Sequence, residues 1–152
     1  MIVDSASNSV LQAVVAARHR AEPQSRAQST SGRLVAHVSQ HTHSSVEKAA
    51  MAAGIGQDNV RNIPVDKEFR MRPEALVQAI RGDLDRGFTP SFAVATVGTT
   101  SSTAVDPVSE IADICRKYRL WLHVDGAYGG SFGVVPEYRH SSTAWSTRTP
   151  LS

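Results

Sequence analysis

The sequence predicts an α/β fold built on a mostly parallel sheet with flanking helices, and three observations support this. Strand-length apolar segments alternate four times with segments of helical pattern, which favours a parallel sheet with right-handed crossovers. The strongest strand segments, 91–97 and 120–124, are almost continuously apolar, which is typical of strands covered on both faces. Turn and cap residues separate the segments. At 152 residues, the chain is about one domain by length.

The first half of the chain contains two predicted helices around one strand. Residues 11–20 are rich in alanine and follow a serine-rich start, which predicts a helix with an N-terminal cap. We expect a polar loop over 22–32 and a short strand over 34–38. Ser44 and Glu47 have capping-box spacing and predict the start of the next helix.

The second half continues the same alternation. Strands are expected over 59–65, 91–97 and 120–124. Helices are expected over 72–86, where a proline occupies the first turn, and over 107–118.

Composition excludes several classes of function. The net charge is +2 and the arginines are scattered, which argues against a nucleic-acid-binding surface. The single Cys115 excludes an internal disulfide. There is no signal-peptide pattern and no apolar run of the roughly 20 residues that span a bilayer. We therefore expect a soluble, cytoplasmic protein that does not bind membranes.

Four polar clusters fall at strand ends or helix starts, on one side of the predicted sheet. Residues 5–7 (SAS) begin a helix whose free N–H groups favour an anion such as phosphate. His43 follows the 34–38 strand, and the hydroxyls of 98–102 (GTTSS) follow the 91–97 strand. Asp125 ends the last strand, at the edge where open α/β sheets bind ligands.

Each cluster also has a structural interpretation. The serines could simply cap a helix, His43 could be a capping or solvated histidine, and 98–102 could be a Ser/Thr turn. Asp125 could be a capped or ion-paired carboxylate. Together, however, the clusters describe a pocket for a phosphate, a flat ring under an imidazole, and a ring cation opposite a carboxylate. A protonated pyridine nitrogen paired with Asp is the arrangement that makes pyridoxal phosphate (PLP) an electron sink.

The motifs carry a resemblance to a known family. They run in order from residue 2 to residue 140: SAS (5–7) with VVAAR (14–18), HSSVEKA (43–49), IPVD (63–66) with FRMRP (69–73), ATVGTT (95–100), VDP (105–107), IADIC (111–115), WLHVD (121–125) with AYGG (127–130), and PEYRH (136–140). The chain resembles the group II PLP-dependent amino-acid decarboxylases, which include the aromatic-L-amino-acid, tyrosine and histidine decarboxylases, and most closely their bacterial members. The resemblance implies part of a fold type I (aspartate-aminotransferase-like) large domain.

The resemblance implies a role for each matching position. The cofactor phosphate would be bound at Ala6 and Ser7, and the pyridine ring would stack on His43. Thr100 would place a hydroxyl near the ring edge. Asp125 would hold the pyridinium, and Ala127 would contact the other face of the ring. His43 and Asp125 would be the catalytic residues, and the pattern implies no metal.

The family also has a lysine that forms a Schiff base with PLP, shortly after the equivalent of His140. The chain has only Lys48, Lys67 and Lys117, and none occupies that place. We expect 1–140 to be a partial PLP-binding domain and 141–152 to be an aberrant, disordered tail. A back-translation of the tail, shifted by one base, can encode a family-like continuation, so we hypothesise a frameshift after His140.

These observations predict a fragment of a PLP-dependent carboxy-lyase that converts an aromatic L-amino acid to its amine and CO2. The parent enzyme would be a homodimer, and the fragment alone would be inactive. Two alternatives remain open: a non-catalytic chain that at most binds PLP or an intact subunit, and a fragment of a glutamate-type decarboxylase or another PLP lyase. A nucleotide-binding domain is disfavoured because the chain lacks a glycine-rich phosphate loop.

Overall fold

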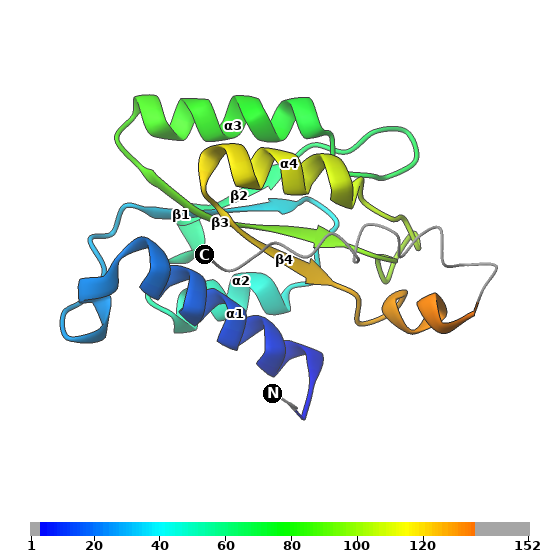
Figure 1. Ribbon diagram of the computed structural model, residues 1–152, viewed down its shortest axis with the longest axis horizontal. Helices are drawn as coiled ribbons and strands as arrows, with labels where there is room; N and C mark the ends of the chain where they lie inside the picture. Colours follow the sequence, from blue (N-terminus) through cyan, green and yellow to red (C-terminus); the bar gives the residue numbers. More distant parts are fainter. Residues whose placement is uncertain (1–3, 136–152) are drawn as a thin grey trace.

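The computed structural model describes residues 4–135, which form one four-stranded parallel sheet between two pairs of helices (Figure 1). The strands lie in the order β2-β1-β3-β4. The elements are α1 (Ala6–Ala21), β1 (Leu34–Ser39), α2 (Ser45–Ala52), β2 (Val60–Ile63), α3 (Pro73–Asp85), β3 (Thr89–Thr96), α4 (Val108–Tyr118) and β4 (Trp121–Asp125), with short 3-10 helices at Pro23–Arg26, Gln57–Asn59 and Gly130–Val134. The predicted parallel α/β fold is confirmed. The segment 136–140 and the predicted tail 141–152 lie outside the described residues.

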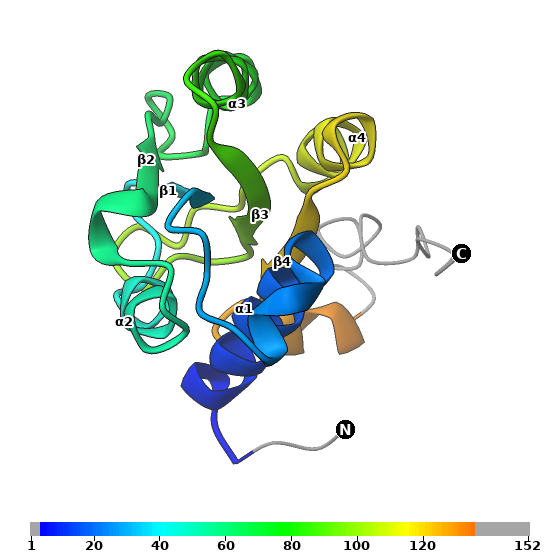
Figure 2. The same ribbon diagram turned by 90° about the vertical axis from the view of Figure 1, so that its left-hand side faces the viewer.

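Alternate residues of the strands face two separate cores. On β3, Phe92 and Val94 pack with α1 and α2, whereas Ala93 and Ala95 pack with α3 and α4. Figure 2 shows α1 and α2 on one side of the sheet and α3 and α4 on the other. Because both faces are covered, the continuously apolar strands of the sequence are explained. The same alternation decides which polar side chains at the strand ends share a face.

Two predicted details of the helices are wrong. Helix α1 begins at Ala6, earlier than expected, because the Ser5 side chain caps it by accepting a hydrogen bond from the Asn8 N–H at 3.3 Å. The capping box at α2 does not form, since the Ser44 side chain makes no cap hydrogen bond. A histidine caps this helix instead, as described below.

A buried ionic cluster ties α3 to the sheet. The Asp83 side chain is fully buried and contacts His37 Nε2 at 3.0 Å, Arg61 Nε at 3.0 Å and Arg86 Nη2 at 2.7 Å. Burial opposes ionisation of Asp83, but the hydrogen bonds from Arg86 and Arg61 outweigh it and hold its pKa below the ordinary value. Burial also lowers the pKa of His37, against the opposing pull of the Asp83 carboxylate.

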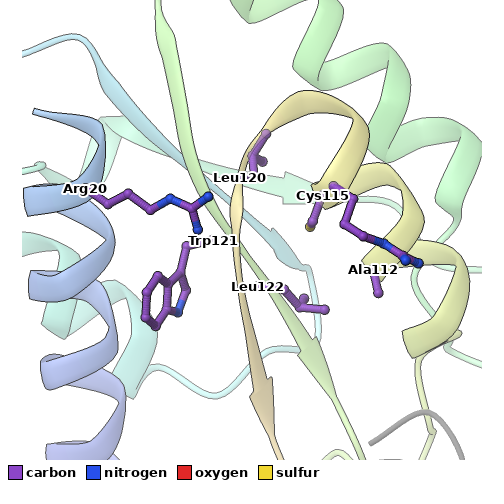
Figure 3. Close-up of a pocket in the computed structure, with 7 residues that line it drawn as sticks. Arg20, Ala112, Cys115, Leu120, Trp121 and Leu122 are labelled. Atoms are coloured by element: carbon purple, nitrogen blue, oxygen red, sulfur yellow. The ribbon is translucent and has the colours of Figure 1, made fainter. Parts of the chain in front are cut away.

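The outer edge of β4 borders a groove of about 200 Å³ between α1 and α4. Figure 3 shows Trp121 pointing from β4 toward the α1 side and Leu122 toward the α4 side. Cys115 of α4 contributes to this groove but is only 2% exposed. Among the described residues, no helix is long and apolar enough to cross a membrane.

We expect the native Cys115 thiol to be nearly inert toward iodoacetamide. Burial raises its pKa to about 12, so only about one thiol in ten thousand is ionised at pH 8, and the thiolate is the nucleophile. Mass spectrometry after timed alkylation measures this, with the urea-unfolded chain as the positive control. Equal alkylation rates in the native and unfolded chains would contradict the prediction.

Candidate active site

A cavity of about 160 Å³ lies at the carboxyl ends of the strands, on the face of the sheet that carries α1 and α2. All six of the predicted site residues line it, together with six further residues. The lining consists of Ala6, Ser7, His41, His43, Ser45, Thr96, Gly98, Thr99, Thr100, Asp125, Ala127 and Tyr128. The structure therefore brings together positions that are up to about 120 residues apart in the sequence.

The first turn of α1 forms one end of the cavity. Ala6 and Ser7 are the first two residues of this helix, so their backbone N–H groups have no partner within the helix. Ser5 caps the following N–H, of Asn8, and both Ala6 and Ser7 line the cavity. Backbone N–H groups and the helix dipole make this end suited to an anionic group.

His43 stands between β1 and α2 and is held by the backbone of the helix that it precedes. Its Nδ1 accepts a hydrogen bond from the Ser45 N–H at 3.2 Å, and Nδ1 lies 2.9 Å from Ser45 Oγ. A nitrogen that accepts from a backbone N–H is unprotonated, so the neutral ring carries its proton on Nε2. The imidazole thus has a defined orientation and tautomer, with Nε2 as a donor.

The segment after β3 closes the cavity with a tight turn. Gly98 has a φ of +80°, and a Cβ there would lie 3.0 Å from Tyr128 Cδ1. Thr99 is buried and its hydroxyl lies 2.6 Å from Ser102 Oγ, which fixes the turn. Thr100 is exposed at the cavity, so the predicted hydroxyl is accessible there.

Asp125 delivers a nearly buried carboxylate to the cavity. It is 9% exposed, and its Oδ1 accepts a hydrogen bond from the Ala127 N–H at 3.1 Å. Within residues 4–135, no cation forms an ion pair with Asp125. His123 lies on the same face of β4, but burial lowers its pKa, which favours its neutral form. The carboxylate is therefore available to a cation that enters the cavity.

Sequence reasoning missed three residues of this site. His41 was not among the predicted site residues, but it lines the cavity and its ring packs edge-on against Phe69 at 5.4 Å. Ser45 was not predicted as a site residue, since the expected capping box used Ser44 and Glu47, but it holds His43. Thr96 was interpreted only as part of a strand. Its place at the carboxyl end of the predicted 91–97 strand, where open α/β sheets bind ligands, was the available signal.

Gly129 lets the loop that carries Ala127 approach β3. Its N–H donates to the Val97 carbonyl at 3.0 Å, and a Cβ on this residue would lie 2.5 Å from the same oxygen. We expect Gly129→Ala to displace the loop and to lower the free energy of unfolding by about 1–3 kcal/mol. Urea denaturation measures this.

Gly82→Ala is the matched control for Gly129→Ala. A Cβ at Gly82 meets nothing within 4 Å, and this residue lies inside α3. The control should therefore stabilise the chain by about 0.5–1 kcal/mol, because alanine is the better helix former. A Gly129→Ala variant as stable as the unaltered chain would show that the loop does not need this close approach.

Comparison with known proteins gives consistent matches. The pyridoxal-dependent decarboxylase conserved domain matches residues 1–151. Tryptophan decarboxylase 2 of Oryza sativa subsp. japonica is 44% identical over 142 residues, which cover 92% of this chain and 28% of that protein. The chain thus spans less than a third of the length of this relative.

Solved structures agree with the predicted fold type I architecture. The crystal structure of Oryza sativa TDC with PLP and tryptamine has a TM-score of 0.88 and 38% identity, covering 95% of this chain and 30% of that one. Mouse CSAD has a TM-score of 0.91 and 34% identity, covering 95% of this chain and 31% of that one. These relatives come from a plant and a mammal, so the expected closeness to bacterial members stays a prediction.

Proposed function

Because the chain belongs to the pyridoxal-dependent decarboxylase family, we propose that it carries the cofactor-binding half-site of a PLP-dependent amino-acid decarboxylase. The observation that supports this most is that one cavity combines the first turn of a helix, an oriented imidazole and a carboxylate with no ion-pair partner among the described residues. The names of the relatives favour an aromatic amino acid such as tryptophan as the substrate of the intact enzyme.

The chemistry of the cavity fits the cofactor. A phosphate needs N–H donors, which Ala6 and Ser7 supply at one end. A protonated pyridine nitrogen needs a carboxylate, and the buried Asp125, which lines the same cavity, supplies one. The buried hydroxyl oxygen of Thr96 has no hydrogen-bond partner within residues 4–135, so this part of the cavity holds an unused polar group. Such a group is expected where a ligand completes the hydrogen bonding.

In the proposed function, each residue that lines the cavity has its own role toward the cofactor. PLP, when bound, supplies an electron sink that accepts the electron pair left by the departing CO2. Asp125 would keep a proton on the ring nitrogen, which maintains that sink. His43 would cover one face of the ring and, through its Nε2–H, could donate a proton. Ala127 would leave room for the other face, and Thr100 would contact the ring edge.

We propose that the chain by itself binds the cofactor without turning over substrate. None of its three lysines lines the cavity. Lys48 is exposed on α2 and borders a neighbouring groove between α1 and α2, which shares Ser7, His43 and Ser45 with the cavity. The homodimer and the cytoplasmic location expected for the intact enzyme stay predictions.

The test uses pyridoxine 5′-phosphate, which has the ring and phosphate of PLP but no aldehyde to react with surface lysines. Saturable binding to the full 152-residue chain, followed by ligand fluorescence, supports the proposal. A parallel sample receives PLP and then borohydride, and peptide mapping locates any reduced adduct.

Each outcome of this test separates the candidate functions. Saturable binding without turnover of aromatic amino acids supports the non-catalytic half-site. An adduct at one defined lysine together with amine production would replace it with an active enzyme. No saturable binding would overturn the proposal and favour an inert chain or one that only pairs with an intact subunit.

A further inference from the structure

Thr96, the last residue of β3, has a buried hydroxyl that no described group satisfies. The residue is 5% exposed, and its Oγ1 is buried without a hydrogen-bond partner. The backbone around it is well fixed, because its N–H donates to the buried carboxylate of Asp106 at 2.8 Å. A buried hydroxyl without a partner destabilises a folded chain, so such a group calls for an explanation.

The position of Thr96 indicates what its hydroxyl serves. Thr96 pairs in register with Asp125 of β4, and parallel register partners project their side chains to the same face. Neighbouring strands lie about 4.8 Å apart, so side chains at paired positions are neighbours on that face, although no hydrogen bond joins Thr96 Oγ1 to Asp125 in this structure. Both residues line the same cavity.

Asp125 has an oxygen to receive such a bond. Its Oδ1 accepts from the Ala127 N–H, and no hydrogen bond to Oδ2 is found among residues 4–135. Building on the proposed function, we propose that the Thr96 hydroxyl donates a hydrogen bond to the Asp125 carboxylate when a pyridinium ligand is bound. Thr96 is then a positioning residue: it orients the carboxylate that holds the ring nitrogen.

This role makes opposite predictions for stability and for binding. Thr96→Val keeps the shape but removes the hydroxyl. In the ligand-free chain the change should raise the thermal midpoint by roughly 2–4 °C, because an unsatisfied buried group is lost. The same change should weaken pyridoxine 5′-phosphate binding by about tenfold, as expected for a lost hydrogen bond to a charged group.

Two variants serve as controls. Thr96→Ser keeps the hydroxyl and should bind within about threefold of the unaltered chain, since such a difference is below 1 kcal/mol. Ser25→Ala removes another buried hydroxyl that has no partner in the described part of the chain, in the 3-10 helix at Pro23–Arg26 and outside the cavity lining. It should not lower the thermal midpoint and should leave ligand affinity unchanged.

A double-mutant cycle tests whether Thr96 acts through Asp125. In the Asp125→Asn background, Thr96→Val should weaken binding by less than about twofold, because the charged acceptor is gone. An equal loss in both backgrounds would overturn the inference and indicate direct contact with the ligand. Equal affinity of the unaltered chain and Thr96→Val would overturn it while leaving the proposed function intact. Failure of the unaltered chain to bind would overturn both.

Discussion

Asp125→Asn is expected to weaken the binding of pyridoxine 5′-phosphate by about 10- to 100-fold, the range for losing a hydrogen bond between charged groups. The substitution keeps the shape of the side chain and an oxygen that can accept from the Ala127 N–H. It removes only the negative charge that would pair with a protonated ring nitrogen. Fluorescence titration at pH 7 measures the change in Kd.

The expected loss of affinity comes from the missing charge pair with the ring nitrogen and not from a loss of stability. Because the hydrogen bond to Ala127 survives, the thermal midpoint should change by less than about 3 °C, which corresponds to roughly 1 kcal/mol at this size. Asp113→Asn is the matched control, since Asp113 is exposed on α4, pairs with Arg116 and does not line the cavity. It should leave the Kd unchanged. Equal affinities of Asp125→Asn and the unaltered chain would show that Asp125 does not hold the ring nitrogen.

Local signals were sufficient to predict most of the fold. The continuously apolar runs of β3 and β4 require cover on both faces, and the structure supplies it with two helix pairs. The start of α1 was placed too late because its first turn, residues 6–10, is polar at most positions. Ser5 nevertheless caps this turn, and side-chain capping does not depend on an apolar stripe.

The site was only partly predictable, for a different physical reason. His43, the 98–102 segment and Asp125 follow from the rule that ligands bind beyond the carboxyl ends of parallel strands, whereas residues 5–7 were predicted from the helix start and the specific roles of Ala6 and Thr100 from the family resemblance. The hydrogen bonds that these residues make with neighbouring residues depend on the directions of the side chains, which the sequence does not show. The capping-box pattern at Ser44 is satisfied in sequence, yet the Ser44 side chain makes no cap hydrogen bond, and the imidazole of His43 accepts from the first N–H of α2 instead.

The register between strands was also beyond reach from the sequence. Whether Thr96 pairs with Asp125 depends on how β3 and β4 align, and a shift of one residue would place Thr96 on the opposite face from Asp125. The sequence also gave no indication of which ionic residues from distant segments would form pairs. His37, Arg61 and Asp83 lie on three elements, and only the folded arrangement brings them together.

The second large effect is expected at Asp83, whose replacement by Asn should lower the free energy of unfolding by about 3 kcal/mol, the lower end for breaking a buried ion pair. The Asp83 side chain is fully buried, and its loss leaves the partly buried Arg61 without its carboxylate and His37 without its anionic partner. Arg86 is 62% exposed, so its own contact adds little. Urea denaturation at pH 7 measures the difference.

The pH dependence provides an independent check on this assignment. Because the folded-state pKa of Asp83 is lowered, its stabilising contribution is present above the ordinary carboxyl pKa of about 4 and is lost as the pH falls through the folded-state value. The stability gap between the unaltered chain and Asp83→Asn should therefore narrow in acid. Asp85→Asn, at an exposed position of the same helix, should change stability by less than about 0.5 kcal/mol at either pH. A gap that stays constant from pH 7 to the acid limit would mean that the Asp83 charge does not anchor α3 to the sheet.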